Sequence, residues 1–380
     1  MTGIDFPNSL GTFYESVTSS LGFKPSRHEG KIVGLAAYGD PEILSNILLT
    51  RFDQTPGSYR LLEANNIYFS RHLASKFPKI DVAAAYQHVL ELIATNFVSY
   101  WQKKTGADAV VLSGGVAANV KMNQRIYEVD GVERIFVYPN MGDGGCGSGL
   151  GMYASWPGGV AEPIENVYLG PEYSEREIAD ALKDENLDFE KPENLAAEVA
   201  ARIHAGEVAA RFAGRMEYGP RALGNRSILY HARDPEVNQW LNNRLGRTEF
   251  MPFAPVTLFE SRHDAYHNIG GAEKAAEFMT VTLDCTEKMK QSCPAAVHID
   301  GTARPQLVRS DVNPGYYSIL KEYEKLSGTP SLINTSFNMH EEPIVCTPQD
   351  AIRAFLQGNL DCLAIGPFLV LHPERDNQNR

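Results

Sequence analysis

Two consecutive strand–glycine–helix units constrain the fold of this chain more than any other feature of its sequence. The strand-like run ADAVVL (107–112) enters a glycine turn (113–119) that opens a helical stretch. The run RIFVYP (134–139) repeats this order, and the glycine turn NMGDGGCGSG (140–149) follows it. Strands that alternate with helices are typical of α/β folds. We therefore expect a mixed α/β fold for this part of the chain.

Helical periodicity predicts the longer elements. Apolar residues recur at helical spacing over 10–23 and over 81–106, where Asp81 is the expected N-cap and Gly106 the expected stop. Further helices are expected over 173–187, 193–206 and 347–359, the last of them capped by Thr347.

The second half of the chain also mixes strands with helices. Its predicted strands span 208–214, 251–256, 277–285, 294–300, 331–337 and 361–373. Prolines and glycines crowd the stretch 156–171 between the halves, which is typical of a domain boundary. We expect one domain over 1–160 and a second over 161–380.

Composition excludes several functional classes. At 380 residues the chain is long enough for two domains, and no run in it is apolar enough for a membrane helix. Its five cysteines lack C-x-x-C spacing, which disfavours disulfides and structural zinc and favours the cytoplasm. A net charge of −12 argues against broad nucleic-acid binding, but it is compatible with a local basic pocket.

Such a basic pocket is indicated by six arginines that lie between Arg215 and Arg247 with no lysine among them. Arginine presents a planar fork that grips phosphate or carboxylate through two hydrogen bonds. The segment GPRALGNR adds turn residues that let backbone approach a ligand. The alternative is a solvated basic surface. The absence of lysine favours an anion-binding site over that alternative.

The two glycine turns are further candidates for ligand binding. Gly114 and Gly115 would let backbone N–H groups face a phosphate, and Asn119 would contact a ribose or base. Asp143, set between glycines, would reach a metal ion or water. The alternatives are a tight turn that starts a helix and an ordinary aspartate in a turn.

Two polar clusters complete the candidates. Asn334, Ser336 and Asn338 follow a predicted strand and would hold phosphate oxygens or an amide group, although they also fit an ordinary cluster that caps the strand end. His263 and His267 have the i, i+4 spacing of two metal ligands, but no third ligand is near. We interpret them as exposed histidines.

Taken together, these segments resemble one family: the O-carbamoyltransferases of antibiotic and nodulation-factor biosynthesis, of the tobramycin carbamoyltransferase type. The order and spacing of six motifs carry the resemblance over nearly the whole chain. They are HEGKIVGLAAYGDP (28–41), LSGGVAANVKMN (112–123), NMGDGGCGSG (140–149), RMEYGPRALGNRSIL (215–229), RTEFMPFAP (247–255) and INTSFNMHEEPIVCTPQDAIRAF (333–355).

The resemblance implies two domains and a two-step reaction. An actin-like (ASKHA) domain comes first, and a domain similar to threonylcarbamoyl-AMP synthase follows it. The second domain would form carbamoyl-adenylate and pyrophosphate from ATP and carbamoyl phosphate. The first would transfer the carbamoyl group to a hydroxyl of a small-molecule acceptor, with a divalent metal (Mg or Fe) as cofactor.

The resemblance also implies roles for the candidate residues. The synthase-like domain would bind its anionic substrates through Arg221, Arg226, Arg247, Asn334, Ser336 and Asn338. The ASKHA-like domain would hold the adenylate through Gly114, Gly115, Asn119, Gly144 and Gly145, with Lys31 as a phosphate contact and Asp143 as the metal ligand. Where many relatives carry a K-x-R pair, Leu245 replaces the lysine and Arg244 would substitute for it.

One departure from the family affects the expected partners. The family's ASKHA domain has a first phosphate loop and an H-x-x-x-H metal pair upstream of the motifs above, and neither occurs in this sequence. Without the first strands of that domain, a sheet edge and part of a core would be exposed. We expect either a partner chain that supplies them or a chain competent in adenylate formation alone.

Two other functions are compatible with the motifs. One is a threonylcarbamoyl-type protein that modifies tRNA, which the acidic charge and the PFAP and NTSFN segments disfavour. The other is a non-catalytic nucleotide-binding subunit. The sequence does not identify the acceptor, because variable loops form acceptor pockets.

Overall fold

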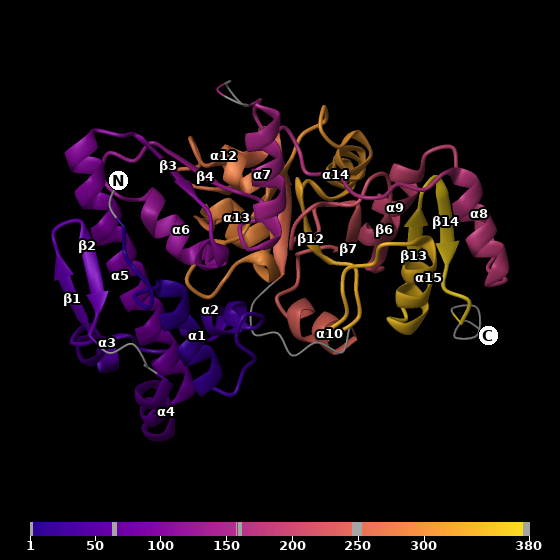
Figure 1. Ribbon diagram of the computed structural model, residues 1–380. Coiled ribbons are helices and arrows are strands. Elements are labelled where there is room, and N and C mark those ends of the chain that lie inside the picture. Colours follow the sequence, from indigo (N-terminus) through magenta and orange to yellow (C-terminus); the bar gives the residue numbers. More distant parts are fainter. Residues whose placement is uncertain (1–2, 63–66, 157, 159–161, 245–252, 375–380) are drawn as a thin grey trace.

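The computed structural model describes residues 3–62, 67–156, 158, 162–244 and 253–374 (Figure 1). The fold is α/β, as the sequence predicted. Helices dominate the first part of the chain, and an eight-stranded mixed sheet organises the second. Among the described residues, no helix combines the length and the apolar character that crossing a membrane requires.

The first part is built around the 27-residue helix α5 (Lys79–Thr105). The helices that contact it are α1 (Leu10–Ser20), α2 (Glu29–Ala36), α3 (Glu42–Leu49), α4 (Ile67–Lys76) and α6 (Val120–Tyr127). β1 (Phe52–Thr55) and β2 (Ser58–Leu61) form an antiparallel hairpin beside them. The predicted stop is confirmed, because Gly106 adopts φ 69° after the last turn. The predicted cap is wrong: the N-cap is Pro78, so Asp81 lies inside the first turn.

Both strand–glycine–helix units are confirmed. β3 (Ala109–Leu112) leads through the 3-10 turn η1 (Gly115–Ala118) into α6, and β4 (Arg134–Val137) leads to α7 (Gly144–Ser155). The two strands pair in parallel. The backbone N–H of Gly114 donates to Met141 O at 2.7 Å. The two glycine turns therefore lie side by side at the ends of adjacent strands.

One face of this unit is uncovered. Of the described strands, only β4 pairs with β3, and Val111 on β3 is 72% exposed. No residue of α7 is buried, and Leu150 and Tyr153 expose 69% and 80% of their surface. Parallel sheets normally have both faces covered. The exposed edge and apolar surface match the expectation from the sequence, and we name them the β3–α7 face.

The eight-stranded sheet has the order β11-β8-β12-β7-β6-β13-β14-β5, with parallel pairs β11/β8 and β6/β13 and antiparallel pairs elsewhere. Its strands are β5 (Phe189–Glu190), β6 (Ala209–Phe212), β7 (Arg226–Tyr230), β8 (Ala254–Leu258), β11 (Gln306–Val308), β12 (Ser331–Ser336), β13 (Cys362–Ile365) and β14 (Phe368–Leu371). These bounds confirm the strands predicted within 208–214, 331–337 and 361–373.

Helices cover both faces of this sheet. α9 (Leu195–His204) and α14 (Pro314–Ser327) share one buried cluster with alternate residues of the strands. α8 (Glu175–Asp184) and α15 (Pro348–Gln357) pack on the opposite face, where Ile178 and Phe355 join the larger core. Thr347 caps α15, as the sequence predicted, and it forms a capping box with Asp350. α10 (Val237–Arg244) follows β7.

The segment 259–303 links the two parts of the chain. It contains η2 (Phe259–Ser261), α11 (Arg262–Ala265), α12 (Glu273–Glu277), β9 (Leu283–Asp284), α13 (Glu287–Ser292), η3 (Pro294–Ala296) and β10 (Thr302–Ala303). The backbone N–H of Ile135 donates to Gly271 O at 3.0 Å, and Asn123 Nδ2 donates to Thr280 O at 2.8 Å. Figure 1 shows this orange segment against β4 and α6. One core therefore runs through both parts.

Two strands predicted in this segment are wrong. Over 277–285 only the two-residue β9 forms, and 294–300 begins with a 3-10 turn. The apolar residues that suggested these strands are buried, but they do not form the predicted strands. They fill the space between the sheet and α6 instead. Pro294 presets the backbone angle of a helical first turn, which explains the start of η3.

Candidate functional site

A cavity of about 370 Å³ lies between α2, the arginine run and the end of β12. We name it the α2–β12 cavity. Four of its lining residues are cationic (Arg27, Lys31, Arg221 and Arg304), three are histidines, and Glu341 is its one acidic lining residue among those described. This surplus of positive charge favours an anionic ligand.

Among the described residues, no carboxylate compensates the charge of Arg221 in this cavity. Its Nε is buried and has no hydrogen-bond partner among the described residues. Burial lowers the pKa of the Arg221 guanidinium, and no carboxylate offsets this effect. A buried cation without a partner is costly unless a ligand supplies the opposite charge. The sequence prediction for Arg221 therefore agrees with its placement.

A carboxylate holds the turn that presents Arg221. Glu217 is buried, and its Oε1 accepts hydrogen bonds from the backbone N–H groups of Leu223 (2.7 Å), Asn225 (2.8 Å) and Arg226 (3.2 Å). The turn is thus fixed before any ligand arrives. Such preorganisation lowers the cost of binding.

Gly224 in this turn is expected to tolerate no side chain. Its φ is 111°, and a Cβ there would lie 2.2 Å from the ring of Tyr316. We expect Gly224→Ala to lower the free energy of unfolding by about 2–4 kcal/mol, measured by urea denaturation. Gly106→Ala is the matched control, since Gly106 also has positive φ but a Cβ added there would meet nothing within 4 Å. Equal losses in the two variants would contradict the contact with Tyr316.

The polar cluster on β12 also lies in the cavity, as Asn334, Ser336 and Asn338 all line it. Asn334 Nδ2 donates to Ala222 O at 3.0 Å and to Gln306 Oε1 at 2.7 Å, which ties β12 to the arginine turn. Its Oδ1 is buried and has no partner in the described part of the chain. Two residues that line this cavity, Arg221 and Asn334, therefore each carry a buried polar atom that has no partner among the described residues.

Arg226 does not contact this cavity, and here the sequence prediction is wrong. The side chain is fully buried, and its guanidinium donates to the carbonyls of Ala213 (2.9 Å) and Asn225 (2.9 Å) and also to Gly214 and Pro171. It lies 3.7 Å from the centre of the Phe212 ring. Burial lowers the pKa of Arg226 to about 10. Its hydrogen-bonding groups hold the loops around β6 and β7.

Two other predicted cations are not placed in the cavity. Arg244 pairs with Asp361 (Nη2 to Oδ1, 3.1 Å) and donates to Asn359 O. Its side chain therefore holds the end of α10 in place. Arg247 lies outside the described residues. Lys31, in contrast, lines the α2–β12 cavity as a phosphate contact requires.

The predicted roles of the glycine turns receive little support from the geometry. Asn119 is buried: its Oδ1 accepts from Met122 N at 3.0 Å to cap α6, and its Nδ2 donates to Gln87 at 2.8 Å. Gly114, Gly115, Gly144 and Gly145 line neither the α2–β12 cavity nor the second cavity described below. The second turn does meet the arginine run, because Tyr218 donates its hydroxyl to Gly144 O.

Asp143 alone does not make a metal site. It is exposed at the start of α7, and no group of three or more His, Cys, Asp and Glu side chains gathers anywhere in the described chain. First-row divalent ions need several ligands. His263 and His267 are exposed, and α11 ends at Ala265, so the two do not share a helix face.

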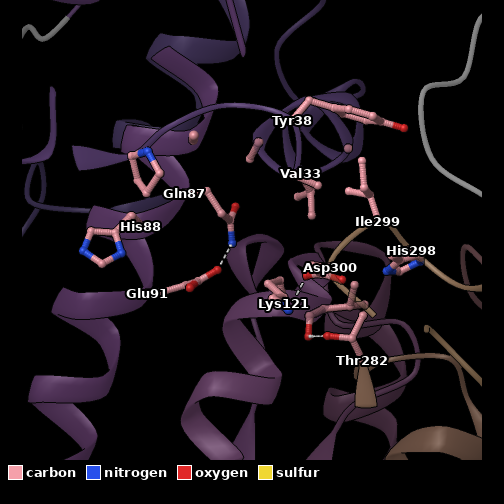
Figure 2. Close-up of a pocket in the computed structure, with 16 residues that line it drawn as sticks. Val33, Tyr38, Gln87, His88, Glu91, Lys121, Thr282, His298, Ile299 and Asp300 are labelled. Atoms are coloured by element: carbon pink, nitrogen blue, oxygen red, sulfur yellow. Dashed lines mark hydrogen bonds and ion pairs between the residues drawn. The ribbon is translucent and has the colours of Figure 1, made fainter. Parts of the chain in front are cut away.

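A second cavity, of about 270 Å³, lies next to the first and is lined by α2, α5, the start of α6 and the loop 298–300. We name it the α2–α5 cavity. Figure 2 shows Gln87, His88 and Glu91 along one side of it and Tyr38, Ile299 and His298 along the other. His298 lines both cavities and therefore forms part of the wall between them.

His298 is held neutral at physiological pH. Burial lowers the pKa of His298 from 6.5 to about 4, and Arg304 and Lys121 act in the same direction against Asp300. Between pH 6.5 and 4 the unfolded chain binds the proton first, so stability falls as pH falls through this window.

We expect His298→Gln to remove about 2 kcal/mol of this acid destabilisation. The measurement is the free energy of unfolding in urea at pH 7 and pH 4.5. His231→Gln is the comparison, because burial also lowers the pKa of His231 to about 4. A His298→Gln protein with the full wild-type loss of stability in acid would contradict the assignment.

Sequence reasoning missed Arg27, His298 and Arg304, which all line the α2–β12 cavity. A weak signal was present. Arg27 directly precedes the HEGK segment, and His298 and Arg304 bracket the polar turn HIDGTAR. The strand predicted over 294–300 includes the start of this turn, so the prediction gives its polar residues no role in a site.

Comparison with known proteins identifies what this chain is similar to. A family model described as "Carbamoyltransferase N-terminus" matches residues 1–152, and one described as "Carbamoyltransferase C-terminus" matches residues 200–372. The uncharacterized protein MJ1058 of Methanocaldococcus jannaschii is 34% identical over 95% of this chain, which spans 62% of that protein. The nodulation protein NolO of Bradyrhizobium diazoefficiens is 33% identical over 97% of this chain, which spans 70% of NolO.

Among solved structures, T. kodakarensis HypF matches 46% of this chain and 21% of its own, with 22% identity and a TM-score of 0.31. A similarity at this level carries no argument about the site.

Proposed function

This chain belongs to the carbamoyltransferase family, and from that premise we propose that it forms carbamoyl-adenylate in the α2–β12 cavity for transfer to a hydroxyl acceptor. ATP and carbamoyl phosphate would be the co-substrates. Adenylate formation would take place at the junction of the arginine turn, β12 and α2.

One observation carries the proposal: Arg221 Nε and Asn334 Oδ1 have no hydrogen-bond partner among the described residues, and both residues line the α2–β12 cavity. Carbamoyl phosphate has the complementary groups, because its phosphate is anionic and its amide N–H groups donate. The orientation of Asn334 is fixed, since its Nδ2 already donates to Ala222 and Gln306. A simple phosphate ester would use the Arg221 side of this pair and leave Asn334 Oδ1 without a partner.

The proposed reaction balances in three steps. Water first converts carbamoyl phosphate to carbamate and inorganic phosphate. A carbamate oxygen then bonds to the α-phosphorus of ATP, and the bond to the β-phosphate breaks to release pyrophosphate. Finally the acceptor oxygen bonds to the carbamoyl carbon, AMP leaves, and the hydroxyl proton passes to solvent.

In these steps the chain's own residues would bind and orient the substrates and neutralise their negative charge. Arg221 would oppose the charge that develops on phosphate oxygens, and Lys31 and Arg304 would add positive charge from the facing wall. Asn334 would accept from the carbamoyl N–H, and Ser336 and Asn338 would border the same group. We assign no step to a metal, because Asp143 brings too few ligands with it.

The test is exchange of labelled pyrophosphate into ATP by the purified chain. We expect exchange with carbamoyl phosphate, and at least about 100-fold less with acetyl phosphate, which carries the same phosphate but no N–H donor. Exchange driven by threonine and bicarbonate instead would indicate the tRNA-modifying alternative. ATP binding in calorimetry with no exchange under any condition would indicate a non-catalytic subunit and overturn the proposal.

We also propose that a second polypeptide segment covers the β3–α7 face. The exposed side chains of Val111, Leu150 and Tyr153 support this proposal. A strand placed beside β3 would protect its amides from hydrogen exchange. Hydrogen exchange of the purified chain is therefore expected to be fast at the β3 amides. Slow β3 exchange in the isolated chain would contradict the proposal.

A further inference from the structure

Glu341 is the one carboxylate among the described residues that line the α2–β12 cavity, and it lies there alongside four cations. Its side chain is 59% exposed, so the carboxylate lies where the cavity opens to solvent. A negative charge at the entrance of a positive cavity opposes the entry and the retention of anions. Glu341 therefore acts against the cations that would bind an anionic ligand.

The turn that carries Glu341 follows β12 and is braced by side chains on both sides of it. Asn338 Nδ2 donates to Met339 O at 2.8 Å and to Glu342 O at 3.0 Å. Arg353 donates to the two carboxylate oxygens of Glu342 at 3.0 and 2.9 Å. Between these contacts Glu341 has φ 62°, which is uncommon for a residue other than glycine. The turn thus keeps Glu341 in a backbone conformation that a free loop would rarely adopt.

Two residues at the start of α2, Arg27 and His28, meet this turn and also line the cavity. Arg27 Nη2 donates to Glu341 O at 2.7 Å, and His28 Nε2 lies 3.8 Å from Glu341 Oε1. The backbone N–H of Lys24 donates to His28 Nδ1 at 3.2 Å. Because a backbone N–H can only donate, this bond assigns the ring N–H of His28 to Nε2, which faces the carboxylate. Arg27 therefore fixes the backbone of Glu341, and His28 attracts its side chain.

We propose that Glu341, positioned by Arg27, determines which anions the α2–β12 cavity retains. Its carboxylate would weaken the binding of pyrophosphate more than the binding of phosphate. Coulomb repulsion grows with the charge of the ligand, and pyrophosphate carries about twice the charge of phosphate. If the cavity forms an adenylate, which rests on the proposed function, the repulsion would favour release of the pyrophosphate product. The effect on inorganic anions rests on the cavity alone.

Calorimetric titration of the purified chain with sodium phosphate and with sodium pyrophosphate, in the absence of divalent metal, measures this selectivity. Glu341→Gln keeps the size of the side chain and removes its charge. We expect it to bind pyrophosphate about tenfold and phosphate about threefold more tightly than the wild-type chain does. Glu341→Asp keeps the charge and should stay within about twofold of the wild-type affinity for both anions.

Glu342→Gln is the matched control. Glu342 is the next residue of the same turn, but it does not line the cavity, and its carboxylate accepts from Arg353. This variant should bind both anions as the wild-type chain does. Equal gains for the two anions in Glu341→Gln, or the same gains in Glu342→Gln, would overturn the inference. The absence of pyrophosphate binding in both the wild-type chain and Glu341→Gln would also overturn it.

Arg27→Met tests whether the hydrogen bond to Glu341 O places the carboxylate at the mouth of the cavity. Loss of the Arg27 charge should weaken the binding of both anions. In this background Glu341→Gln should tighten pyrophosphate binding by only about threefold, because the turn has lost its contact with α2. A full gain of about tenfold in the double variant would show that Arg27 does not position Glu341.

Pyrophosphate exchange on the same preparations separates this inference from the proposed function. Exchange in the wild-type chain, without a charge-dependent change of anion binding in Glu341→Gln, would sink the inference alone. Charge-dependent anion binding without exchange would sink the proposed function. It would leave Glu341 as the residue that sets the charge selectivity of an anion-binding cavity.

Discussion

Arg221→Met is expected to lower carbamoyl-phosphate-dependent pyrophosphate exchange by at least about 100-fold, the loss that follows removal of one preorganised donor from an active site. The free energy of unfolding should stay the same or rise slightly. Arg221 Nε is buried without a partner among the described residues, so the wild-type chain already bears the cost of desolvating this charge. Methionine has similar length and no charge to desolvate.

Exchange kinetics and urea denaturation of the same preparation measure the two effects. Arg353→Met is the matched control, since Arg353 is 46% exposed and pairs with Glu342 at the surface. It should change neither quantity by much, because an exposed ion pair contributes about 1 kcal/mol or less. Full exchange in Arg221→Met would remove the anion-binding role of this residue. A large loss of stability would show that its charge is compensated within the fold.

Arg226→Met is expected to show the opposite profile, with a loss of about 3–5 kcal/mol in the free energy of unfolding. The substitution leaves the buried carbonyls of Ala213 and Gly214 without the guanidinium donor that now satisfies them. The carbonyls of Pro171 and Asn225 lose one of two donors, since each also accepts from a backbone N–H group. The substitution also removes the contact between the guanidinium and the Phe212 ring. Unsatisfied buried acceptors cost about 1–3 kcal/mol each, and part of that cost is relieved by relaxation and water.

Urea denaturation measures this loss, with Arg353→Met again as the control. Arg226→Lys should recover little of the stability, because an ammonium group cannot reproduce the planar fork that reaches several carbonyls. A loss below about 1 kcal/mol in Arg226→Met would show that the carbonyls find other donors and would contradict the structural role.

Arg221 and Arg226 show that the sequence of a site does not determine which of its side chains face the ligand. Both lie in one glycine-punctuated run, and the prediction of an anion site there is consistent with the cavity that Arg221 lines. Which arginine faces the cavity depends on β7, whose first residue is Arg226 and whose buried register turns that side chain into the fold. No local pattern in the run distinguishes the two.

Two local signals were correct, whereas a third, the N-cap expected at Asp81, was wrong. The glycine that ends α5 and the Thr347 cap that starts α15 act through their own turns, and both were predicted. The segment 277–300 was mispredicted because its apolar residues serve a tertiary purpose, filling the junction between the sheet and α6. Both cavities lie at that junction, so His298 and Arg304 were missed for the same reason.

The β3–α7 face has a practical consequence for anyone who purifies this chain alone. A strand edge with one described neighbour is a template for pairing with a second copy, so self-association is expected to grow with protein concentration. The net charge of −12 opposes that contact by repulsion between copies. Salt shortens the range of this repulsion to about 10 Å at 0.1 M. Dilute solutions of low ionic strength should therefore keep the chain monodisperse, and salting should drive it toward aggregates joined through β3.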